Sequence, residues 1–345
     1  MSEPATTAPP PPAEAQTGAA PDSVTPDTIM QTAMGFMAAK HLFAASELGV
    51  FEALGQGPAN LDELAARTSV PRRTLRISVD AMVALGFVVR DGDRYSNGPV
   101  AATFLAGGTP ADLRPFLRFW NRISYPAWIH LEDALRTDIP EAPGYDAEEQ
   151  AIFLAGVEAV TAGPAQALAA SYDFSTHRRL LDLGGGTGSI SCFIASRHPH
   201  LTGTIMDLPD VVPLTTERVA ARGLSDRLIA IEGDLLKGSY PGGYDVLLLA
   251  NVVHYFDGER NRAVLQHARE AAPAGGRLLL LDFWTDAGHT EPMGAAMMAG
   301  EFAVQLGGDV YSVDEVRTWL ENTGWRFVEH LPLAGPMSLV VAEAV

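Results

Sequence analysis

In the second half of the chain, short apolar runs alternate with longer segments in which apolar positions recur at helical spacing. From about Ser175, the apolar runs end in turn on Asp182, Asp207, Asp234, Asn251 and Asp282. This alternation predicts strands separated by helices. Strands joined in this way pair in parallel with right-handed crossovers, which brings their carboxyl ends to one edge of a sheet. We therefore expect residues 175–345 to form an open α/β domain with a polar rim along that edge.

The carboxyl terminus breaks the alternation. Two apolar runs, near 325–333 and 338–344, are separated only by a turn at Gly335-Pro336. No helix fits between them, so they predict an antiparallel hairpin at one edge of the sheet.

The pattern before residue 175 is mostly helical. Residues 1–26, rich in Pro, Ala and Thr, have no periodic apolar face, and we expect a disordered tail. The helix predicted from Asp27 is too apolar to face water, which indicates packing against another chain or a second domain. Its apolar positions include Ile29, Met30, Met34, Met37, Leu42 and Phe43.

Residues 27–110 carry the signals of a winged-helix module. Asn60 and Glu63 predict a capped helix, and Arg72 to Leu85 a second helix. A hairpin follows around the Asp91-Gly92 turn. Such modules often bind DNA, but this region has seven basic and eight acidic residues, a net charge of −1. A DNA-binding regulator therefore stays a minor alternative.

A segment rich in aromatic residues, 111–174, joins the two parts. It is expected to be helical, with turns at 140–144 and at Gly163-Pro164 and a capping box at Asp146 and Glu149. Each aromatic residue has a simple interpretation as core packing between domains. Alternatively, a few of them wall an apolar acceptor pocket at the domain junction. The candidates are Trp120, Tyr125, Trp128 and Phe153.

Composition limits the ligands. The 345-residue chain has a formal net charge of −18, which disfavours attachment to nucleic acid or anionic lipid. Its one cysteine, Cys192, suits a reducing compartment. No signal peptide and no apolar stretch of 18 residues stand out, so a cytoplasmic protein acting on small molecules is expected, with no membrane contact.

The turn after the first strand of the α/β domain has the pattern Asp-x-Gly-x-Gly-x-Gly. Its glycines are Gly184, Gly186 and Gly188, with Gly185 between the first two. Ser189 stands where a dinucleotide fingerprint needs Gly or Ala, which argues against a nicotinamide or flavin cofactor. The turn resembles the first motif of Rossmann-like S-adenosylmethionine-dependent methyltransferases. The resemblance implies S-adenosylmethionine as cofactor and a seven-stranded sheet.

Farther along, the rim resembles small-molecule O-methyltransferases in particular. Asp207-Leu208-Pro209 is similar to the family segment that holds the adenosine ribose, and Gly233-Asp234-Leu235 to the segment that meets the adenine. By this resemblance Asp182 lies near the charged amino-acid end of the cofactor. Asn251, at the end of the fourth strand, is a further candidate cofactor contact.

His254 follows the fourth strand and has a suitable intrinsic pKa for a general base. It matches the catalytic histidine of O-methyltransferases that modify phenols, and Asp282 matches the acid that orients it. Four positions depart from the family. His254 is followed by Tyr255-Phe256 instead of Asp-Trp, Ala250 replaces a common lysine, and Val310 replaces a second acid. The alternative interpretation, that His254 serves only for capping or shape, stays open.

Two methionines, Met293 and Met297, lie on a predicted helix within 291–308 and are candidates to line an acceptor pocket. Core packing explains them equally well. His289 and His254 have no clear third ligand, so no metal site is expected.

Together these features predict a methyltransferase that modifies a hydroxyl of a small aromatic or polyketide-like natural product. In the family, the winged-helix module builds a homodimer. The principal alternative is methylation of an activated aromatic or enolic carbon, and related enzymes also methylate nitrogen.

Overall fold

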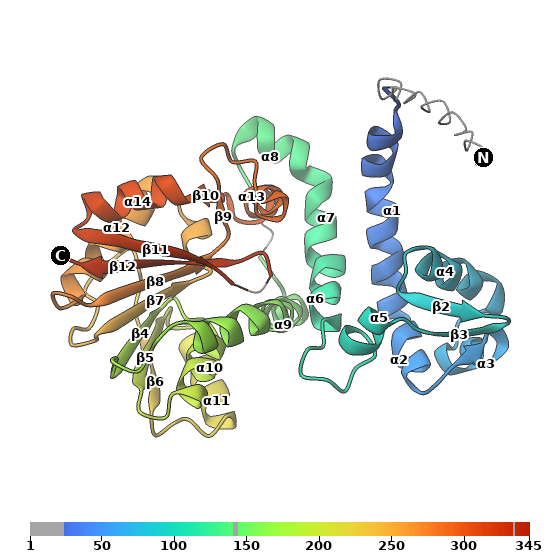
Figure 1. Cartoon of the computed structure of the whole chain (residues 1–345), viewed down its shortest axis with the longest axis horizontal. Coiled ribbons are helices and arrows are strands. Elements are labelled where there is room, and N and C mark those ends of the chain that lie inside the picture. Colours follow the sequence, from blue (N-terminus) through green and yellow to red (C-terminus); the bar gives the residue numbers. More distant parts are fainter. Residues whose placement is uncertain (1–23, 141–143, 334) are drawn as a thin grey trace, which may run out of the picture.

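The computed structural model describes residues 24–140, 144–333 and 335–345. Most of the expected tail, residues 1–23, and part of the turn expected at 140–144 lie outside this range. A helical and winged N-terminal domain and an α/β domain are joined by a column of helices (Figure 1). This two-part architecture confirms the fold class expected from the sequence.

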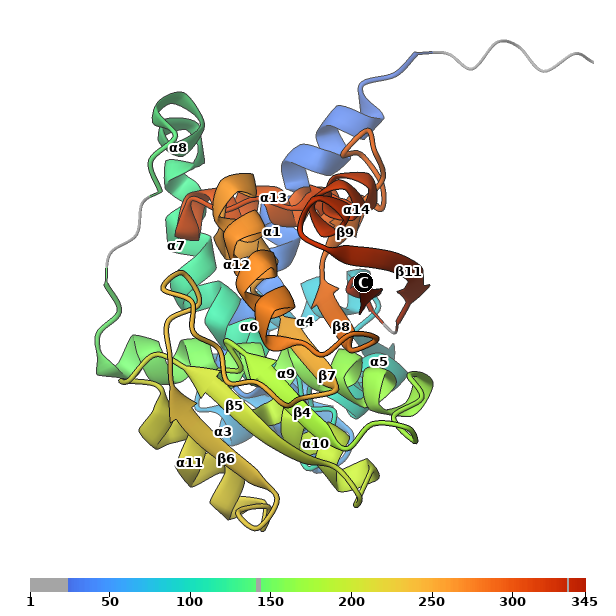
Figure 2. The ribbon, with the colours of Figure 1, turned by 90° about the vertical axis from the view of Figure 1, so that its left-hand side faces the viewer.

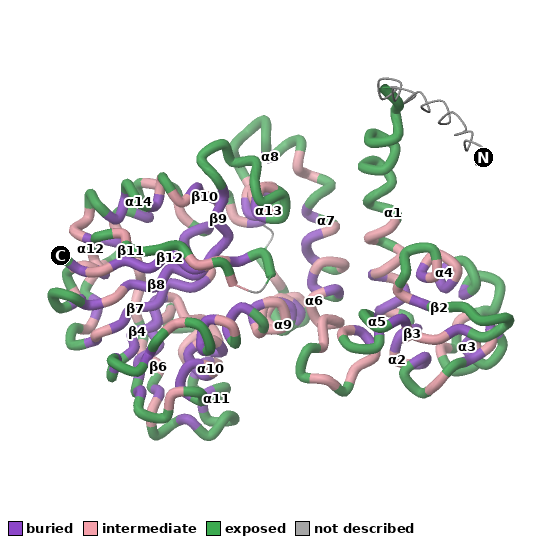
Figure 3. The backbone as a smooth tube through the Cα atoms, in the orientation of Figure 1, coloured by how far each residue is buried: buried purple, intermediate pink, exposed green. Residues whose placement is uncertain are grey.

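The N-terminal domain has a small antiparallel sheet in the order β1-β3-β2. Its strands are β1 (Ala59–Asn60), β2 (Val88–Asp91) and β3 (Arg94–Asn97), and its helices are α1 (Asp27–Glu47), α2 (Val50–Gly55), α3 (Leu61–Thr68), α4 (Arg72–Ala84) and α5 (Pro99–Phe104). The predicted capping box is present: the Asn60 side chain accepts from the backbone N–H groups of Asp62 and Glu63. The first half of α1 is exposed along its length (Figure 3).

The connecting column consists of α6 (Arg114–Phe119), the π-helix η1 (Trp120–Ser124), α7 (Tyr125–Ala127), the 3₁₀-helix η2 (Trp128–His130), α8 (Leu131–Thr137) and α9 (Ala147–Ser171). A turn at Gly163-Pro164 was expected, and this is wrong. Pro164 lies inside α9, which continues past it. The capping box of Asp146 and Glu149 does form at the start of α9.

Helix α9 also corrects the expectation that no long apolar stretch exists. Among the described residues it is long and apolar enough, by length and composition, to cross a membrane. In this fold it packs against α6 on one side and α10 on the other. These contacts are those of a helix that bridges two parts of one protein.

The α/β domain is built on a seven-stranded sheet in the order β11-β12-β8-β7-β4-β5-β6. Its strands are β4 (Arg179–Leu183), β5 (Thr202–Asp207), β6 (Leu228–Glu232), β7 (Val246–Ala250), β8 (Arg277–Asp282), β11 (Trp325–Pro332) and β12 (Ser338–Ala344). Strands β4 to β8 are parallel, and β11 and β12 form the predicted antiparallel hairpin. The chain reverses its direction of winding between β4 and β7, where ligands bind in such sheets.

Helices cover both faces of this sheet (Figure 2). They are α10 (Ser189–Arg197), α11 (Val212–Ala221), α12 (Gly258–Ala271), α13 (Met293–Leu306) and α14 (Val313–Asn322). Short elements complete the domain: the 3₁₀-helix η3 (Val253–Tyr255) and the paired strands β9 (Trp284–Thr285) and β10 (Tyr311–Ser312). One apolar core lies under α12 and α14, and a second lies between the sheet, α9, α10 and α13.

Candidate active site

The glycine turn lies between β4 and α10 in a conformation that favours glycine. Gly184, Gly186 and Gly188 have φ values of +72°, +55° and +73°, in the left-handed region. A side chain at Gly185 is excluded by crowding, because its Cβ would lie 2.7 Å from the Asp182 carboxylate. The turn therefore exposes backbone where a ligand can approach closely.

Beneath the turn, Asp182 is 1 % exposed. Its Oδ2 accepts a hydrogen bond from Ser191 Oγ at 2.5 Å, while its Oδ1 is buried without a hydrogen-bond partner in the described part of the chain. Burial raises the pKa of Asp182 to about 7, and the nearby Asp207 raises it further against the opposing Ser191 bond. A carboxyl group in this state favours a positively charged neighbour.

The acids that follow β5 and β6 are more open. Asp207 ends β5, and its two oxygens accept from the N–H groups of Gly186 (2.7 Å) and Leu208 (2.7 Å). Asp234 forms an ion pair with Lys237 at 3.0 Å. The hydrogen bond from Lys237 lowers the pKa of Asp234, with a further contribution from the Leu236 N–H. The Asp234 carboxylate is thus an ionised acceptor at neutral pH.

The remaining predicted cofactor residues lie in the same region. Side chains built on Gly184 and Gly233 would come within 3.2 Å of Leu235 and 2.5 Å of Met206, so these backbones approach apolar neighbours closely. Leu235 packs against the core, while Leu208 is 47 % exposed. Asn251 has a φ of +55°, a strained conformation for a residue with a side chain, as often occurs at functional sites.

His254 lies on η3, directly after β7, and is 6 % exposed. Its Nδ1 is 2.7 Å from Asp282 Oδ1. The same carboxylate accepts from the backbone N–H groups of Val253 and Phe283, at 3.1 and 2.9 Å. With Nδ1 donating to Asp282, the neutral ring carries its lone pair on Nε2. This geometry is the one that a general base with an orienting acid requires.

Helix α13 closes over the imidazole. The rings of Phe302 and His254 are stacked, with centroids 3.8 Å apart and planes 7° from parallel. Phe302 was not assigned to the site from the sequence, and neither was its neighbour Glu301. The sequence analysis pointed to this helix through Met293 and Met297, whereas the signal for Glu301, a single acid within the apolar run 293–306, was not used.

The candidate acceptor residues do not gather in one place. Trp120 and Tyr125 pack on the N-terminal core, Tyr125 against Phe43 and beneath Lys40. Phe153 packs between Phe119 and Tyr145. Trp128 donates its indole N–H to Glu301, beside α13. On the same helix, Met293 and Met297 are 73 % and 61 % exposed.

His289, considered with His254 as a metal ligand, lies 3.2 Å from Glu315 instead. Among the described residues, no group of three or more His, Cys, Asp and Glu side chains is arranged to hold a metal ion. His254 Nδ1 lies against Asp282 instead.

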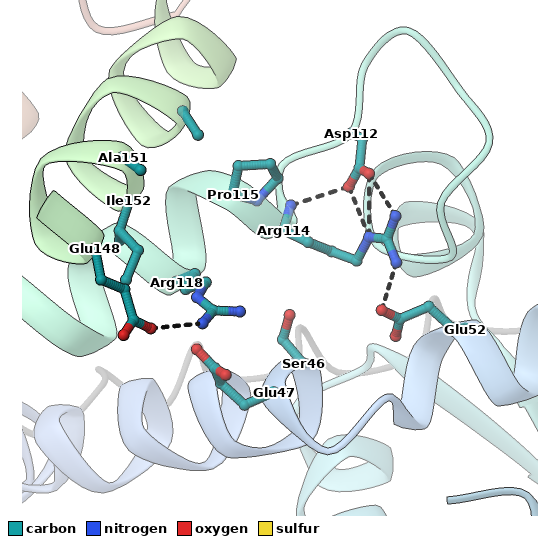
Figure 4. A pocket seen from close by; sticks show the side chains of 11 residues that line it. Ser46, Glu47, Glu52, Asp112, Arg114, Pro115, Arg118, Glu148, Ala151 and Ile152 are labelled. Carbon is teal, nitrogen blue, oxygen red and sulfur yellow. Dashed lines mark hydrogen bonds and ion pairs between the residues drawn. The ribbon is translucent and has the colours of Figure 1, made fainter.

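A cavity of about 550 Å³ lies away from the rim, between the N-terminal domain, α6 and α9 (Figure 4). Arg114 crosses it, with Asp112 and Glu52 as partners. The Asp112 hydrogen bond raises the pKa of Arg114. The Arg114–Glu52 ion pair here joins the connecting column to the N-terminal domain.

Two known protein families match this chain, one in its N-terminal part and one in its C-terminal part. Residues 130–326 match the O-methyltransferase domain family, and residues 30–107 match the O-methyltransferase dimerisation domain. The chain is 33 % identical to 3-hydroxy-5-methyl-1-naphthoate 3-O-methyltransferase of Streptomyces sahachiroi, over 92 % of this chain and 95 % of that protein. It is 30 % identical to the N,N-dimethyltransferase OxyT of Streptomyces rimosus, over 87 % and 90 %.

Among solved structures, that of PigF with SAH superposes with a TM-score of 0.81 at 27 % identity, covering 93 % of this chain and 100 % of that one. Three findings point to the same family: the two domain matches, the identity across nearly the whole chain, and the shared fold. The protein is therefore a member of the S-adenosylmethionine-dependent O-methyltransferase family.

Proposed function

We propose that this enzyme methylates a hydroxyl group of a small aromatic or polyketide-like natural product, with His254 as the general base. The observation that carries the proposal is the buried His254–Asp282 pair, at 2.7 Å, at the carboxyl end of the strands beside the glycine turn. Similarity to an enzyme named for a naphthoate hydroxyl supports the acceptor class.

The chain's own residues have distinct tasks in this reaction. When bound, S-adenosylmethionine supplies a methyl group carried on a positively charged sulfur. His254 Nε2 accepts the proton of the acceptor hydroxyl as the new carbon–oxygen bond forms and the carbon–sulfur bond breaks. Asp282 keeps the ring in the correct tautomer and stabilises the imidazolium that results.

The residues present fit the cofactor. Asp182, whose Oδ1 has no hydrogen-bond partner among the described residues, and the open space beside Gly186 suit a cationic group that approaches closely. Asp207 would accept from ribose hydroxyls, and Asp234 from the adenine amine, with Leu208 and Leu235 against the adenosine. Gly188 and Gly233 allow the chain to turn there, and Asn251 borders the same edge.

The dimerisation-domain match supports a homodimer formed through the N-terminal domain. The apolar side chains on the first half of α1 are more than half exposed in the single chain, as an interface would require. A DNA-binding role has less support, because Arg72 and Arg76 pair with Asp62 and Asp80. We propose a cytoplasmic location for the enzyme.

Methyl transfer from isotope-labelled S-adenosylmethionine into a panel of phenolic acceptors tests the function, with NMR locating the methylated atom. We expect an O-methyl product. A methyl on carbon or nitrogen would reject the acceptor assignment.

The His254→Ala variant tests the base, and we expect kcat to fall by roughly 10²- to 10⁴-fold. Cofactor affinity, measured by calorimetry, should stay unchanged because His254 does not contact the glycine turn. Unchanged turnover in a variant that binds cofactor would reject the role of His254.

A further inference from the structure

Helix α13 is held at both sides, by the connecting column on one and by His254 on the other. Glu301 and Phe302 are consecutive residues on this helix, and each is 6 % exposed. Their side chains point to different neighbours because consecutive helical residues are separated by about 100° around the axis. Glu301 binds the column, and Phe302 covers the imidazole.

We propose that Glu301 and Phe302 act as positioning residues for His254, which rests on His254 being the base. Glu301 fixes α13 to the connecting column, and Phe302 then fixes the plane of the imidazole ring.

The first step is that Asp282 alone leaves one motion of the ring open. A hydrogen bond at Nδ1 sets the position of that atom, but the ring can still rotate about the line joining Nδ1 to Oδ1. A parallel ring at 3.8 Å blocks this rotation, because turning the imidazole would drive its edge into Phe302. Tyr255 is also stacked on the imidazole, with centroids 4.8 Å apart and planes at 28°, but Phe302 is the closer and more nearly parallel ring, so it contributes most to the direction of Nε2.

Backbone contacts hold the other end of the helix against the same residue. The Asp309 N–H donates to the His254 carbonyl oxygen at 3.2 Å. A Cβ on Gly308 would lie 1.8 Å from that oxygen, so only glycine permits this approach. The carboxyl end of α13 and η3 thus move as one unit.

The second step is the attachment of α13 to the column. Glu301 accepts from Ser124 Oγ at 2.6 Å and from the Trp128 indole N–H, and Gln305 Nε2 lies 3.4 Å away. The Trp128 ring also lies against Gly300, where a Cβ would approach within 2.9 Å. This contact with Trp128 requires a small residue at position 300, and the buried acid that binds the indole N–H is its neighbour, Glu301.

A buried acid is a poor choice for stability alone. Removing a carboxylate from water carries a large penalty, and apolar residues of similar volume often replace buried ionic groups without loss. What the hydrogen bonds supply is a single position for α13 relative to the column, and Phe302 transmits this position to His254.

The test is the ¹H–¹³C spectrum of the protein with labelled histidine, recorded without acceptor, alongside steady-state kinetics. The protons of an imidazole held over a phenyl face are shifted upfield, so the His254 signal, assigned with the His254→Gln variant, reports the stack. In Glu301→Ala we expect this signal to move toward that of an exposed histidine. We also expect kcat to fall roughly 10-fold while the dissociation constant for S-adenosylmethionine stays the same.

The matched control is Tyr145→Phe, which removes a bond at the same interface, from the Tyr145 hydroxyl to Gln305 at 3.2 Å, without touching Glu301. It should leave the His254 signal and kcat near wild type. Within the site, Phe302→Leu should reduce the upfield shift to the part that the stacked Tyr255 ring causes and should lower kcat, and Phe302→Tyr should restore both because it keeps the ring.

An unchanged His254 signal in a folded Glu301→Ala protein would overturn the proposal. If that variant does not fold, Glu301→Met gives the answer, since its side chain keeps a similar volume but accepts neither bond, and an unmoved signal there has the same meaning. Full activity of His254→Ala would reject the base but leaves the spectrum as an independent measure of the positioning.

Discussion

The two halves of the rim differ in the hydrogen bonds that their acidic side chains accept within the protein. The cofactor half comprises Asp182, Asp207 and Asp234, after β4, β5 and β6, and the base half comprises His254 and Asp282, after β7 and β8. In the base half, Asp282 accepts three hydrogen bonds, one from His254 and two from backbone N–H groups. In the cofactor half, Asp182 keeps a buried oxygen without a partner among the described residues, and Asp234 pairs only with backbone and an exposed lysine.

This contrast separates two uses of a carboxylate. An acid that orients another side chain is saturated before any ligand arrives, because its task is to keep one geometry. An acid that receives a ligand retains free acceptor positions, because the ligand supplies the remaining hydrogen bonds. Changes in the base half should therefore alter kcat, and changes in the cofactor half should alter affinity.

After His254→Ala, the largest effect should come from Asp282→Asn. An amide in this position donates where the carboxylate accepts, so it favours the wrong tautomer of His254. We expect kcat to fall roughly 10- to 100-fold with little change in cofactor affinity. Single-turnover kinetics and calorimetry measure the two quantities. Loss of affinity with normal kcat would place Asp282 in the cofactor half instead.

The next largest effect should come from Gly308→Ala. The new Cβ, 1.8 Å from the His254 carbonyl oxygen, forces α13 and η3 apart. Overpacking of this kind destabilises a fold by about 1–3 kcal/mol, and displacement of His254 should lower kcat as well. Thermal unfolding and kinetics report both.

The control is Gly294→Ala, on the same helix, where the nearest atom to a new Cβ is Pro336 Cβ at 3.8 Å. It should leave kcat unchanged, and a loss as large as that of Gly308→Ala would mean that any added methyl on α13 disturbs the site.

The sequence predicted the strand-end residues of both halves, including the pairing of His254 with Asp282, but not the helix that covers the base. Asp182, Asp207 and Asp234 are adjacent to strand ends, so local pattern and parallel pairing were enough to bring them together. Phe302 reaches His254 only because α13 folds back over the rim, and no local pattern encodes that contact. Likewise, Tyr125 faces Phe43 of the N-terminal domain because of how the column packs, which its spacing did not reveal.

Asp182→Asn should produce opposite changes in stability and affinity. Burial raises the pKa of Asp182 to about 7, whereas the unfolded group titrates near 3.8. Between these values the folded state binds more protons than the unfolded state, so the contribution of Asp182 to stability falls as pH rises from about 4 to 7. Asparagine removes this dependence.

The variant should therefore gain about 2 kcal/mol in unfolding free energy relative to wild type between pH 5 and pH 7. Its affinity for S-adenosylmethionine should fall, because the negative charge facing the cofactor is lost. Denaturant unfolding at several pH values and calorimetry in two buffers test both. Parallel pH curves for the two proteins would show that Asp182 does not titrate in this range.

Lys237→Ala should have the smallest effect. The lysine side chain is 82 % exposed, and its hydrogen bond to Asp234 is the main cause of that carboxyl's lowered pKa. Without Lys237 the pKa of Asp234 returns toward 3.8, and the group stays ionised at pH 7 with a free oxygen for the adenine amine. We expect cofactor affinity within roughly 2-fold of wild type, whereas Asp234→Ala should weaken it by 10-fold or more because the acceptor is gone. Equal losses in the two variants would mean that the ion pair, and not the carboxylate, receives the cofactor, and the distinction between the two halves of the rim would then fail at β6.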